Sequence, residues 1–263
     1  MVSIGYAASS EEHEAVRLVE WVQGAEEAGF SFALVSDHYH PWIDAQGQSP
    51  FVWSVLGAIA QSTRTIQVGT GVTCPIQRIH PAIVAQAGAT VASMMPGRFF
   101  LGVGTGEQLN EHVTGDPWPL IHHRRAMLRE AIEVIRQLWR GEQTTFEGDY
   151  FTVEDARVYS LPPNPPPIYV AASGEESATL AGEAGDGVIT TAPKLEVLEA
   201  YSVAGGRGPH LGQVAVCWGP DEQAANRPCA SSGRSAASAA PSGQISVARR
   251  TSRLRPSRCQ SNR

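Results

Sequence analysis

The chain has 263 residues, of which 42% are hydrophobic and 17% charged, and its formal net charge is −6. This length can bury a large core, and the negative balance argues against a nucleic-acid partner. The four cysteines form no C-x-x-C pair, the N-terminus lacks a signal-peptide pattern, and no apolar run reaches the roughly 18 residues of a membrane span. We therefore expect a cytoplasmic protein without a membrane anchor.

Short apolar runs alternate along the chain with segments of helical periodicity. The first run is Val2–Tyr6, and Ser9 and Glu12 then form a capping-box pattern that predicts a helix ended by Gly29. Six further strands are expected at Phe32–Ser36, Ile66–Val72, Arg98–Val103, Ile168–Ala172, Gly187–Thr191 and Gln213–Trp218. Further helices are expected at Val52–Ala60, Pro81–Met95, His122–Arg140, Glu175–Gly185 and Leu195–Ala204, with a hairpin at Thr144–Phe146 and Tyr150–Val153.

The seven expected strands are apolar on both faces, which is typical of a parallel sheet covered by helices. Alternation of strands and helices over this length predicts an α/β fold, either a (β/α)8 TIM barrel or a doubly wound sheet. No segment is recognised as an eighth strand or as the last two helices. A barrel is therefore expected to be incomplete at its C-terminal end.

The composition changes at about residue 225, which divides the chain into a barrel domain, 1–225, and a basic tail, 226–263. The tail holds 8 Arg and 9 Ser but no Lys, Asp or Glu, and it has no periodicity. A disordered basic tail, a solvated tail without function and out-of-frame translation of GC-rich DNA all fit this composition. Out-of-frame translation is favoured because natural basic tails usually contain Lys. If it is correct, the chain can be an inactive, truncated product of a frameshifted gene.

Reactive groups in parallel α/β folds lie where strands end, and the segment after the second strand is the richest in them. It contains Asp37, His38, His40 and Trp42 within SDHYHPW. Histidine is the usual proton-transfer group near neutral pH. A His pair that only caps a loop is the alternative. A metal site at His38 and His40 is disfavoured because no third ligand is evident.

Glycine-rich segments end the third and fourth strands. GTGVTCP, at 69–75, allows close approach of the backbone to a ligand, and a plain turn is the alternative. GVGTGE, at 102–107, fails the dinucleotide pattern because its last position is Glu107. That carboxylate can act as an acid or base if burial raises its pKa, or it can cap the helix that follows.

The segment AASGEES, at 171–177, leads from the fifth strand into a helix N-terminus. Backbone N–H groups there offer a site for an anion such as phosphate, and ordinary helix capping is the alternative. His122–Arg125 reads as the solvated first turn of its helix.

Together and in this order, SDHYHPW, GTGV, RFFLGVGTGE followed by LNE, and YVAASG resemble the coenzyme F420-dependent oxidoreductases of the luciferase-like superfamily. The similarity is greatest to the glucose-6-phosphate dehydrogenase-like subfamily and extends from Met1 to about Glu222. It implies a TIM barrel of the luciferase-like type, C-terminally incomplete here, that binds the deazaflavin F420 and a small-molecule substrate. FMN is the alternative cofactor, in a luciferase-like monooxygenase.

The resemblance also assigns roles to individual residues. It implies that His38 and Glu107 share the proton transfer and that Trp42 places the substrate. The positions implied to line the cofactor are Asp37, Gly71, Val72, Cys74, Thr105, Gly106, Asn110, Ser173, Gly174, Glu176 and Ser177, the last four around its phosphate. The Gly71–Val72 bond matches a non-prolyl cis peptide of the family. Thr191 and Lys194 match part of a site for a substrate phosphate, no metal is implied, and a homodimer is allowed.

Overall fold

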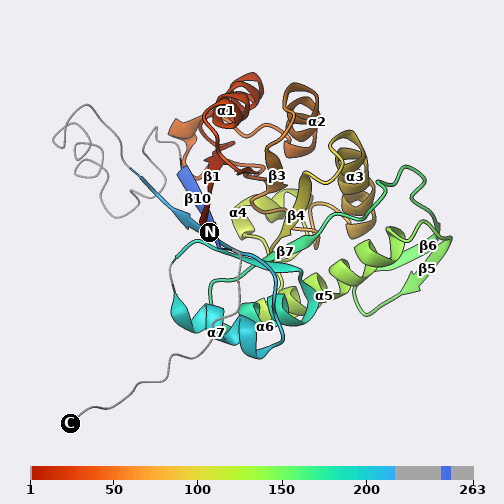
Figure 1. Ribbon diagram of the computed structural model, residues 1–263. Coiled ribbons are helices and arrows are strands. Elements are labelled where there is room, and N and C mark those ends of the chain that lie inside the picture. The colour runs from red at the N-terminus through yellow and green to blue at the C-terminus, as the bar shows by residue number, and fades with distance from the viewer. Residues whose placement is uncertain (1, 193, 217–243, 250–263) are drawn as a thin grey trace, which may run out of the picture.

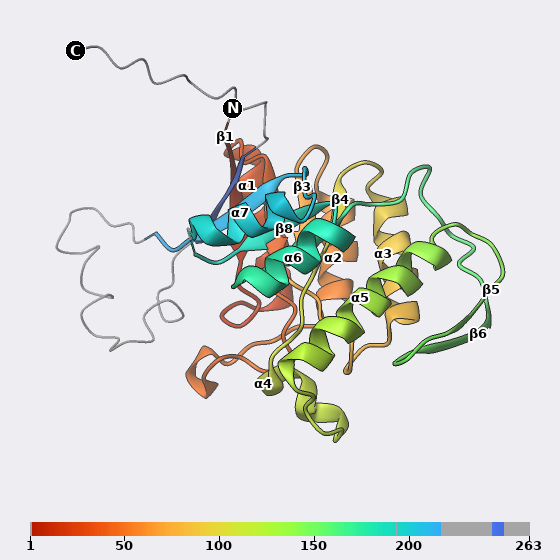
Figure 2. The same cartoon turned by 90° about the horizontal axis from the view of Figure 1, so that it is seen from below.

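The computed structural model describes residues 2–192, 194–216 and 244–249, in which a closed barrel is surrounded by helices (Figure 1; Figure 2). The barrel strands are β1 Val2–Ala8, β2 Phe32–Val35, β3 Gln67–Thr70, β4 Phe99–Val103, β7 Ile168–Ala171, β8 Gly187–Thr190, β9 His210–Val214 and β10 Gln244–Arg249. A separate hairpin consists of β5 Thr144–Glu147 and β6 Thr152–Ala156.

The helices follow the strands in the alternation that the sequence predicted. They are α1 Ala15–Glu27, α2 Val52–Ser62, α3 Pro81–Met94, α4 Gln108–Glu111, α5 Ile121–Leu138, α6 Glu175–Ala184 and α7 Leu195–Val203, with short 3-10 helices η1 Asp44–Gln46 and η2 His112–Thr114. Among the described residues, no helix combines the length and the apolar character that crossing a membrane requires.

The strand order around the barrel is β1-β10-β9-β8-β7-β4-β3-β2. Neighbouring strands pair in parallel along the series β1, β2, β3, β4, β7, β8 and β9. Of the two folds that the sequence allowed, the structure therefore confirms the barrel and not the doubly wound sheet. The seven predicted strands are present with slightly different ends. The largest difference is at the seventh, expected at Gln213–Trp218, because the pairing of β8 with β9 begins already at His210.

Strand β10 lies in the segment where the sequence indicated no strand. It runs antiparallel to both β1 and β9 and fills the position between them. Seven parallel strands alone would leave unpaired N–H and C=O groups along two edges, and an extended segment of almost any sequence can pair with them. The seven predicted parallel strands are thus confirmed and no parallel eighth strand follows them, while the antiparallel β10, which the sequence did not indicate, closes the barrel. The rest of the predicted tail lies outside the described residues.

The barrel interior is filled by a small apolar cluster that includes two phenylalanines facing glycines across the sheet. Phe32 pairs in register with Gly5, and Phe100 with Gly69. A Cβ at Gly5 would lie 2.3 Å from the Phe32 ring, and one at Gly69 would lie 2.1 Å from the Phe100 ring. Each ring therefore occupies the space above its glycine, and with Leu34, Ile189 and Leu211 these rings form the floor below the strand ends.

On the outside of the barrel, Glu26 at the end of α1 holds the turn between α2 and β3. Its carboxylate accepts hydrogen bonds from the backbone N–H groups of Arg64, Thr65 and Ile66, at 2.6–3.1 Å, and from the Thr65 hydroxyl at 3.0 Å. Partial burial raises the pKa of Glu26, but these donors outweigh it and lower the pKa to about 2. The ionised carboxylate is therefore the form that stabilises this connection.

We expect Glu26→Gln to lower the free energy of unfolding at pH 7 by about 1 kcal/mol, a value reduced for solvent screening. Because the folded-state pKa lies below the ordinary 4.5, the stabilisation is present above pH 4.5 and is lost as the pH falls towards about 2. Urea unfolding of both proteins between pH 7 and pH 3 measures this. Glu27→Gln is the matched control at an exposed neighbour, and an equal loss there would contradict the prediction.

Candidate active site

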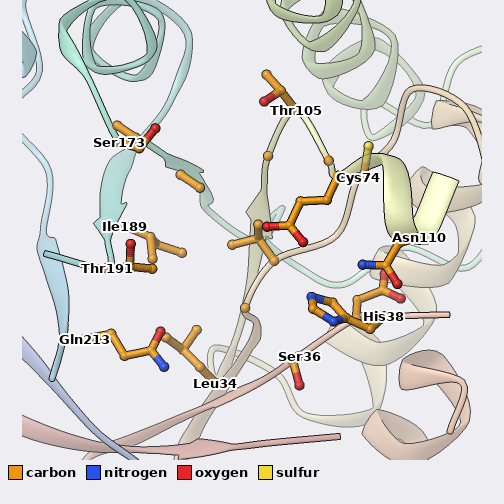
Figure 3. Close-up of a pocket in the computed structure, with 18 of the residues that line it drawn as sticks. Leu34, Ser36, His38, Cys74, Thr105, Asn110, Ser173, Ile189, Thr191 and Gln213 are labelled. Carbon is orange, nitrogen blue, oxygen red and sulfur yellow. The ribbon is translucent and has the colours of Figure 1, made fainter. Parts of the chain in front are cut away.

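The carboxyl ends of the parallel strands surround a cavity of about 960 Å³ (Figure 3). Its wall is made by the segments that follow β1, β2, β3, β4, β7, β8 and β9, so residues far apart in sequence share one space. This is the face of a (β/α)8 barrel where catalytic groups are found. The cavity is large enough for a cofactor-sized molecule beside a small substrate.

The structure brings almost all of the residues that the sequence singled out to this cavity. The predicted residues that line it are Asp37, His38, Trp42, Gly71, Val72, Cys74, Thr105, Gly106, Glu107, Asn110, Ser173, Gly174, Glu176, Ser177 and Thr191. Lys194 is the exception. It is exposed, and its Nζ donates to the Ser173 carbonyl at 3.1 Å, next to the wall.

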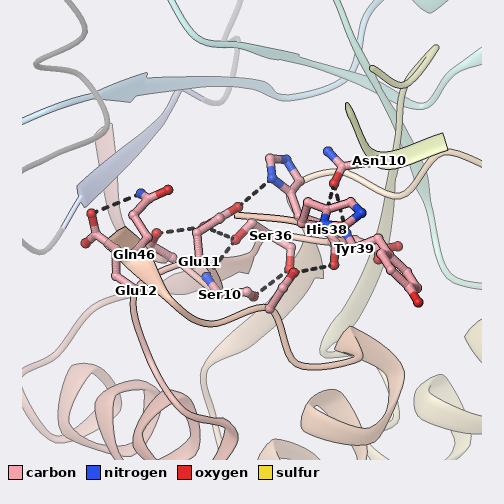
Figure 4. A network of polar contacts seen from close by, with 12 residues as sticks. Ser10, Glu11, Glu12, Ser36, His38, Tyr39, Gln46 and Asn110 are labelled. Atoms are coloured by element: carbon pink, nitrogen blue, oxygen red, sulfur yellow. Dashed lines mark hydrogen bonds and ion pairs between the residues drawn. The ribbon is translucent and has the colours of Figure 1, made fainter. Parts of the chain in front are cut away.

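His38 lies at the end of β2 and is oriented by a buried carboxylate. Its Nδ1 lies 2.9 Å from Oε1 of Glu11, whose other oxygen accepts from the hydroxyls of Ser9, at 2.7 Å, and Ser36, at 2.9 Å (Figure 4). Because Nδ1 is engaged with Glu11, Nε2 is the ring nitrogen that remains to exchange a proton with a ligand. The imidazole also packs edge-on against the Trp42 ring, at a centroid distance of 4.8 Å.

The contact between Glu11 and His38 shifts the pKa of each group towards its charged form. Burial raises the pKa of Glu11, but the hydrogen bond and positive charge of His38 outweigh it and bring the pKa to about 2. Burial lowers the pKa of His38, but the contact with Glu11 and the negative charges of Glu107 and Asp37 raise it above its ordinary value. Glu11 therefore makes His38 a stronger base while fixing its orientation.

Glu11 is the functional residue that sequence reasoning missed. The capping box predicted for Ser9 and Glu12 is wrong, because α1 begins only at Ala15 and the Ser9 hydroxyl bonds to Glu11 instead. The segment between β1 and α1 is an irregular loop from which Glu11 and Glu12 line the cavity. A carboxylate at the end of the first predicted strand was the available signal.

Glu107 occupies the N-cap position of α4, but its side chain makes no capping hydrogen bond. The alternative interpretation of Glu107 as a helix cap is therefore wrong for its side chain, which lines the cavity. Burial raises the pKa of Glu107, partly opposed by the positive charge of His38. A carboxyl with a raised pKa and no capping partner is suited to gain or lose a proton during a reaction.

The glycine-rich segments bring backbone close to the cavity. The Gly71–Val72 peptide bond is cis, as predicted. Gly106 has a φ of +69°, and a Cβ there would lie 2.4 Å from Sγ of Cys74. A larger residue at Gly106 would therefore displace the loop that carries Thr105 and Glu107.

Asn110, on α4, fixes the loop that follows His38. Its Oδ1 accepts from the backbone N–H groups of Tyr39, at 2.9 Å, and His40, at 3.1 Å (Figure 4). The His40 ring turns to His112, on which it stacks at 5.4 Å. Among the described residues, no group of three His, Cys, Asp or Glu is arranged to hold a metal ion.

The N-terminus of α6 forms the opposite wall. Ser177 Oγ accepts from the N–H groups of Ser173 and Gly174, both at 3.2 Å, and donates to the Gly174 carbonyl at 2.8 Å. A Cβ at Gly174 would meet nothing within 4 Å, so the space above this turn is open. Glu176 pairs with Arg125 of α5, which neutralises a carboxylate that would otherwise repel an anion here.

A family model described as luciferase-like monooxygenase matches residues 2–253. The chain is 48% identical over 212 residues to an F420-dependent hydroxymycolic acid dehydrogenase of Mycobacterium tuberculosis, covering 78% of this chain and 59% of the relative. It is 46% identical over 194 residues to an F420-dependent glucose-6-phosphate dehydrogenase of Segniliparus rotundus, covering 73% and 58%. The chain thus spans less than two thirds of the length of these relatives.

Solved structures with the same fold include an F420-dependent secondary alcohol dehydrogenase in complex with an F420-acetone adduct. It is 38% identical, with a TM-score of 0.74 over 76% of this chain and 62% of that chain. An F420-dependent tetrahydromethanopterin reductase from Methanopyrus kandleri is 26% identical, with a TM-score of 0.66 over 78% and 62%. The monooxygenase RslO1 from Streptomyces bottropensis, at 24% identity, TM-score 0.74 and coverage of 89% and 77%, shows the fold alone.

We expect Glu11→Gln to lower the pKa of His38, because the substitution removes the negative charge that favours the imidazolium. The His38 ring signal in NMR spectra should then titrate at a lower pH than in the unmodified protein, with His38→Gln identifying the signal among the eight histidines. Glu12→Gln is the control, since Glu12 lines the same cavity but bonds to Gln46. An unchanged titration in Glu11→Gln would contradict the assigned pairing.

Proposed function

The chain belongs to the luciferase-like monooxygenase family, and from this premise we propose that it is an oxidoreductase that uses the deazaflavin F420 to exchange a hydride with a small organic substrate. The observation that carries the proposal is that His38, Trp42 and Glu107 together line the large cavity at the carboxyl ends of the strands. The names of the relatives that bind or use F420 support it.

The donor set of the cavity fits the proposed cofactor. At the N-terminus of α6, the first backbone N–H groups and the open space above Gly174 can accommodate a phosphate. Lys194 lies next to this turn, where its Nζ donates to the Ser173 carbonyl. The Gly71–Val72 peptide and the Thr105–Gly106 segment line the space between this turn and His38, where a flat ring system would lie. When bound, the deazaflavin supplies the hydride acceptor or donor.

We assign the proton transfer to His38. In the oxidation of an alcohol, Nε2 of neutral His38 accepts the hydroxyl proton as the carbon gives up its hydride. Glu11 holds the ring by Nδ1 and stabilises the imidazolium that results. In the reverse direction the protonated ring returns the proton to the carbonyl oxygen.

Glu107 is proposed as the second proton-transfer group, on the strength of its raised pKa and its place in the same wall. Trp42, packed on the His38 ring, limits the space from which a substrate reaches Nε2. Thr191, at the end of β8, and Lys194 remain proposed substrate contacts. The substrate itself is proposed only as a small molecule that carries an alcohol or carbonyl group.

We expect the protein to bind F420 with quenching of cofactor fluorescence and to bind FMN more weakly. Gly174→Val should weaken F420 binding at least about tenfold, because the added side chain occupies the open space above the α6 turn. Gly24→Val is the matched control, because Gly24 in α1 also has open space around it but does not line the cavity. Tight FMN binding without F420 binding would favour the monooxygenase alternative and contradict the proposal.

We expect His38→Asn and Glu107→Gln each to lower kcat by about 10²–10⁴-fold, the usual contribution of general acid–base catalysis, with little change in F420 affinity. The measurement is the rate of loss of deazaflavin absorbance with an alcohol substrate. In this direction kcat/KM should rise as the pH passes through the raised pKa of His38. His122→Asn, at the exposed start of α5, is the control, and full activity in His38→Asn would remove His38 from the mechanism.

A further inference from the structure

We propose that Arg78 is a positioning residue that ties the proton-transfer histidine to its supporting loop by holding the carboxylates of Asp37 and Glu111 together. The proposal rests on the proposed function in that it concerns the same His38. Arg78 itself is not part of the cavity wall.

Arg78 lies in the loop after β3 and contacts two other segments of the site. Its Nη2 donates to Oδ1 of Asp37 at 2.8 Å, and its Nε lies 3.5 Å from Oε1 of Glu111. Its backbone N–H also donates to the other oxygen of Glu111 at 2.9 Å. The side chain of Arg78 is 7% exposed and those of both carboxylates 1%, so water screens these contacts little.

The two carboxylates are chain neighbours of site residues. Asp37 precedes His38, and Glu111 follows Asn110, whose Oδ1 holds the backbone of Tyr39 and His40. Arg78 thus joins the segment after β2 and the end of α4 through one guanidinium, one residue away from His38 and from Asn110. Thr73 completes the cluster by donating to Oδ2 of Asp37 at 2.7 Å.

The charge of Arg78 also bears on His38, through its ion pair with Asp37. The ionisable groups that act on His38 are Glu11 from the loop after β1, Asp37 from the end of β2 and Glu107 from the start of α4. Arg78 compensates only Asp37 among these. Removing Arg78 would therefore leave a buried negative charge beside His38, which favours the imidazolium.

The first test is the NMR titration of His38 in the protein without cofactor. We expect Arg78→Met to move the titration to higher pH, Asp37→Asn to move it to lower pH, and the double variant to titrate close to the unmodified protein. Arg98→Met is the control, because Arg98 is likewise held by hydrogen bonds, to the Thr63 hydroxyl and the Ile66 carbonyl, but lies before β4, at the opposite end of the strands. No shift in Arg78→Met, a shift to lower pH, or an equal shift in Arg98→Met would overturn the proposal.

The second test separates position from charge. Arg78→Lys keeps the charge but cannot hold both carboxylates in the same geometry, so kcat should fall at least about tenfold while the His38 titration stays near that of the unmodified protein. Unchanged kcat in Arg78→Lys overturns the positioning role. If Arg78→Met does not fold, the titration of Asp37→Asn still tests the effect of charge on His38, and the kcat of Arg78→Lys still tests the positioning role. Because the titration needs neither cofactor nor substrate, an inactive unmodified protein would count against the proposed function alone.

Discussion

The parallel register of the barrel is the constraint on which the site depends. Because strands from β1 to β9 run in one direction, the residue that follows each strand arrives at the same face. The pairs of Phe32 with Gly5 and Phe100 with Gly69 fill the barrel below that face, so the cavity has a solid floor. His38 and Ser177 thereby share one cavity although they lie 139 positions apart in the sequence.

Burial of charge then decides what each carboxylate at this face can do. Glu11 has His38 as its partner, and Asp37 and Glu111 share Arg78, so these three are held in place and act through others. Glu107 forms no ion pair within the part of the chain that the structure describes, and burial raises its pKa. A group whose proton is free to move is more useful in catalysis than one fixed by an ion pair. A carboxylate near the strand ends is thus either fixed by an ion pair or left able to exchange a proton, depending on its neighbours.

The strands and the cavity-facing segments could be predicted because both have local signals. Continuous apolar runs identify buried parallel strands, and a polar cluster such as Asp37, His38 and Trp42 directly after a strand marks the reactive face. Glu11 had one weak local signal, its place after the first predicted strand, and Arg78 had none, because the roles of both come from side chains 27 and 41 residues away. Ser9 and Glu12 matched a capping pattern that the tertiary contact of Glu11 overrode. β10 was missed because backbone pairing at open edges requires little of the sequence.

The two sides of the cavity differ in the chemical groups that they present. The side formed by β2, β3 and β4 carries the ionisable groups His38, Glu107 and the Arg78 cluster, whereas the side formed by β7 and α6 offers mainly backbone N–H groups and small side chains. Hydrogen-bond donors fixed in the backbone bind an anion without titrating. The proposed proton transfer on one side can therefore be tuned by charge, whereas the proposed phosphate site on the other side relies on backbone N–H groups, so substitutions on the two sides should separate catalysis from cofactor binding.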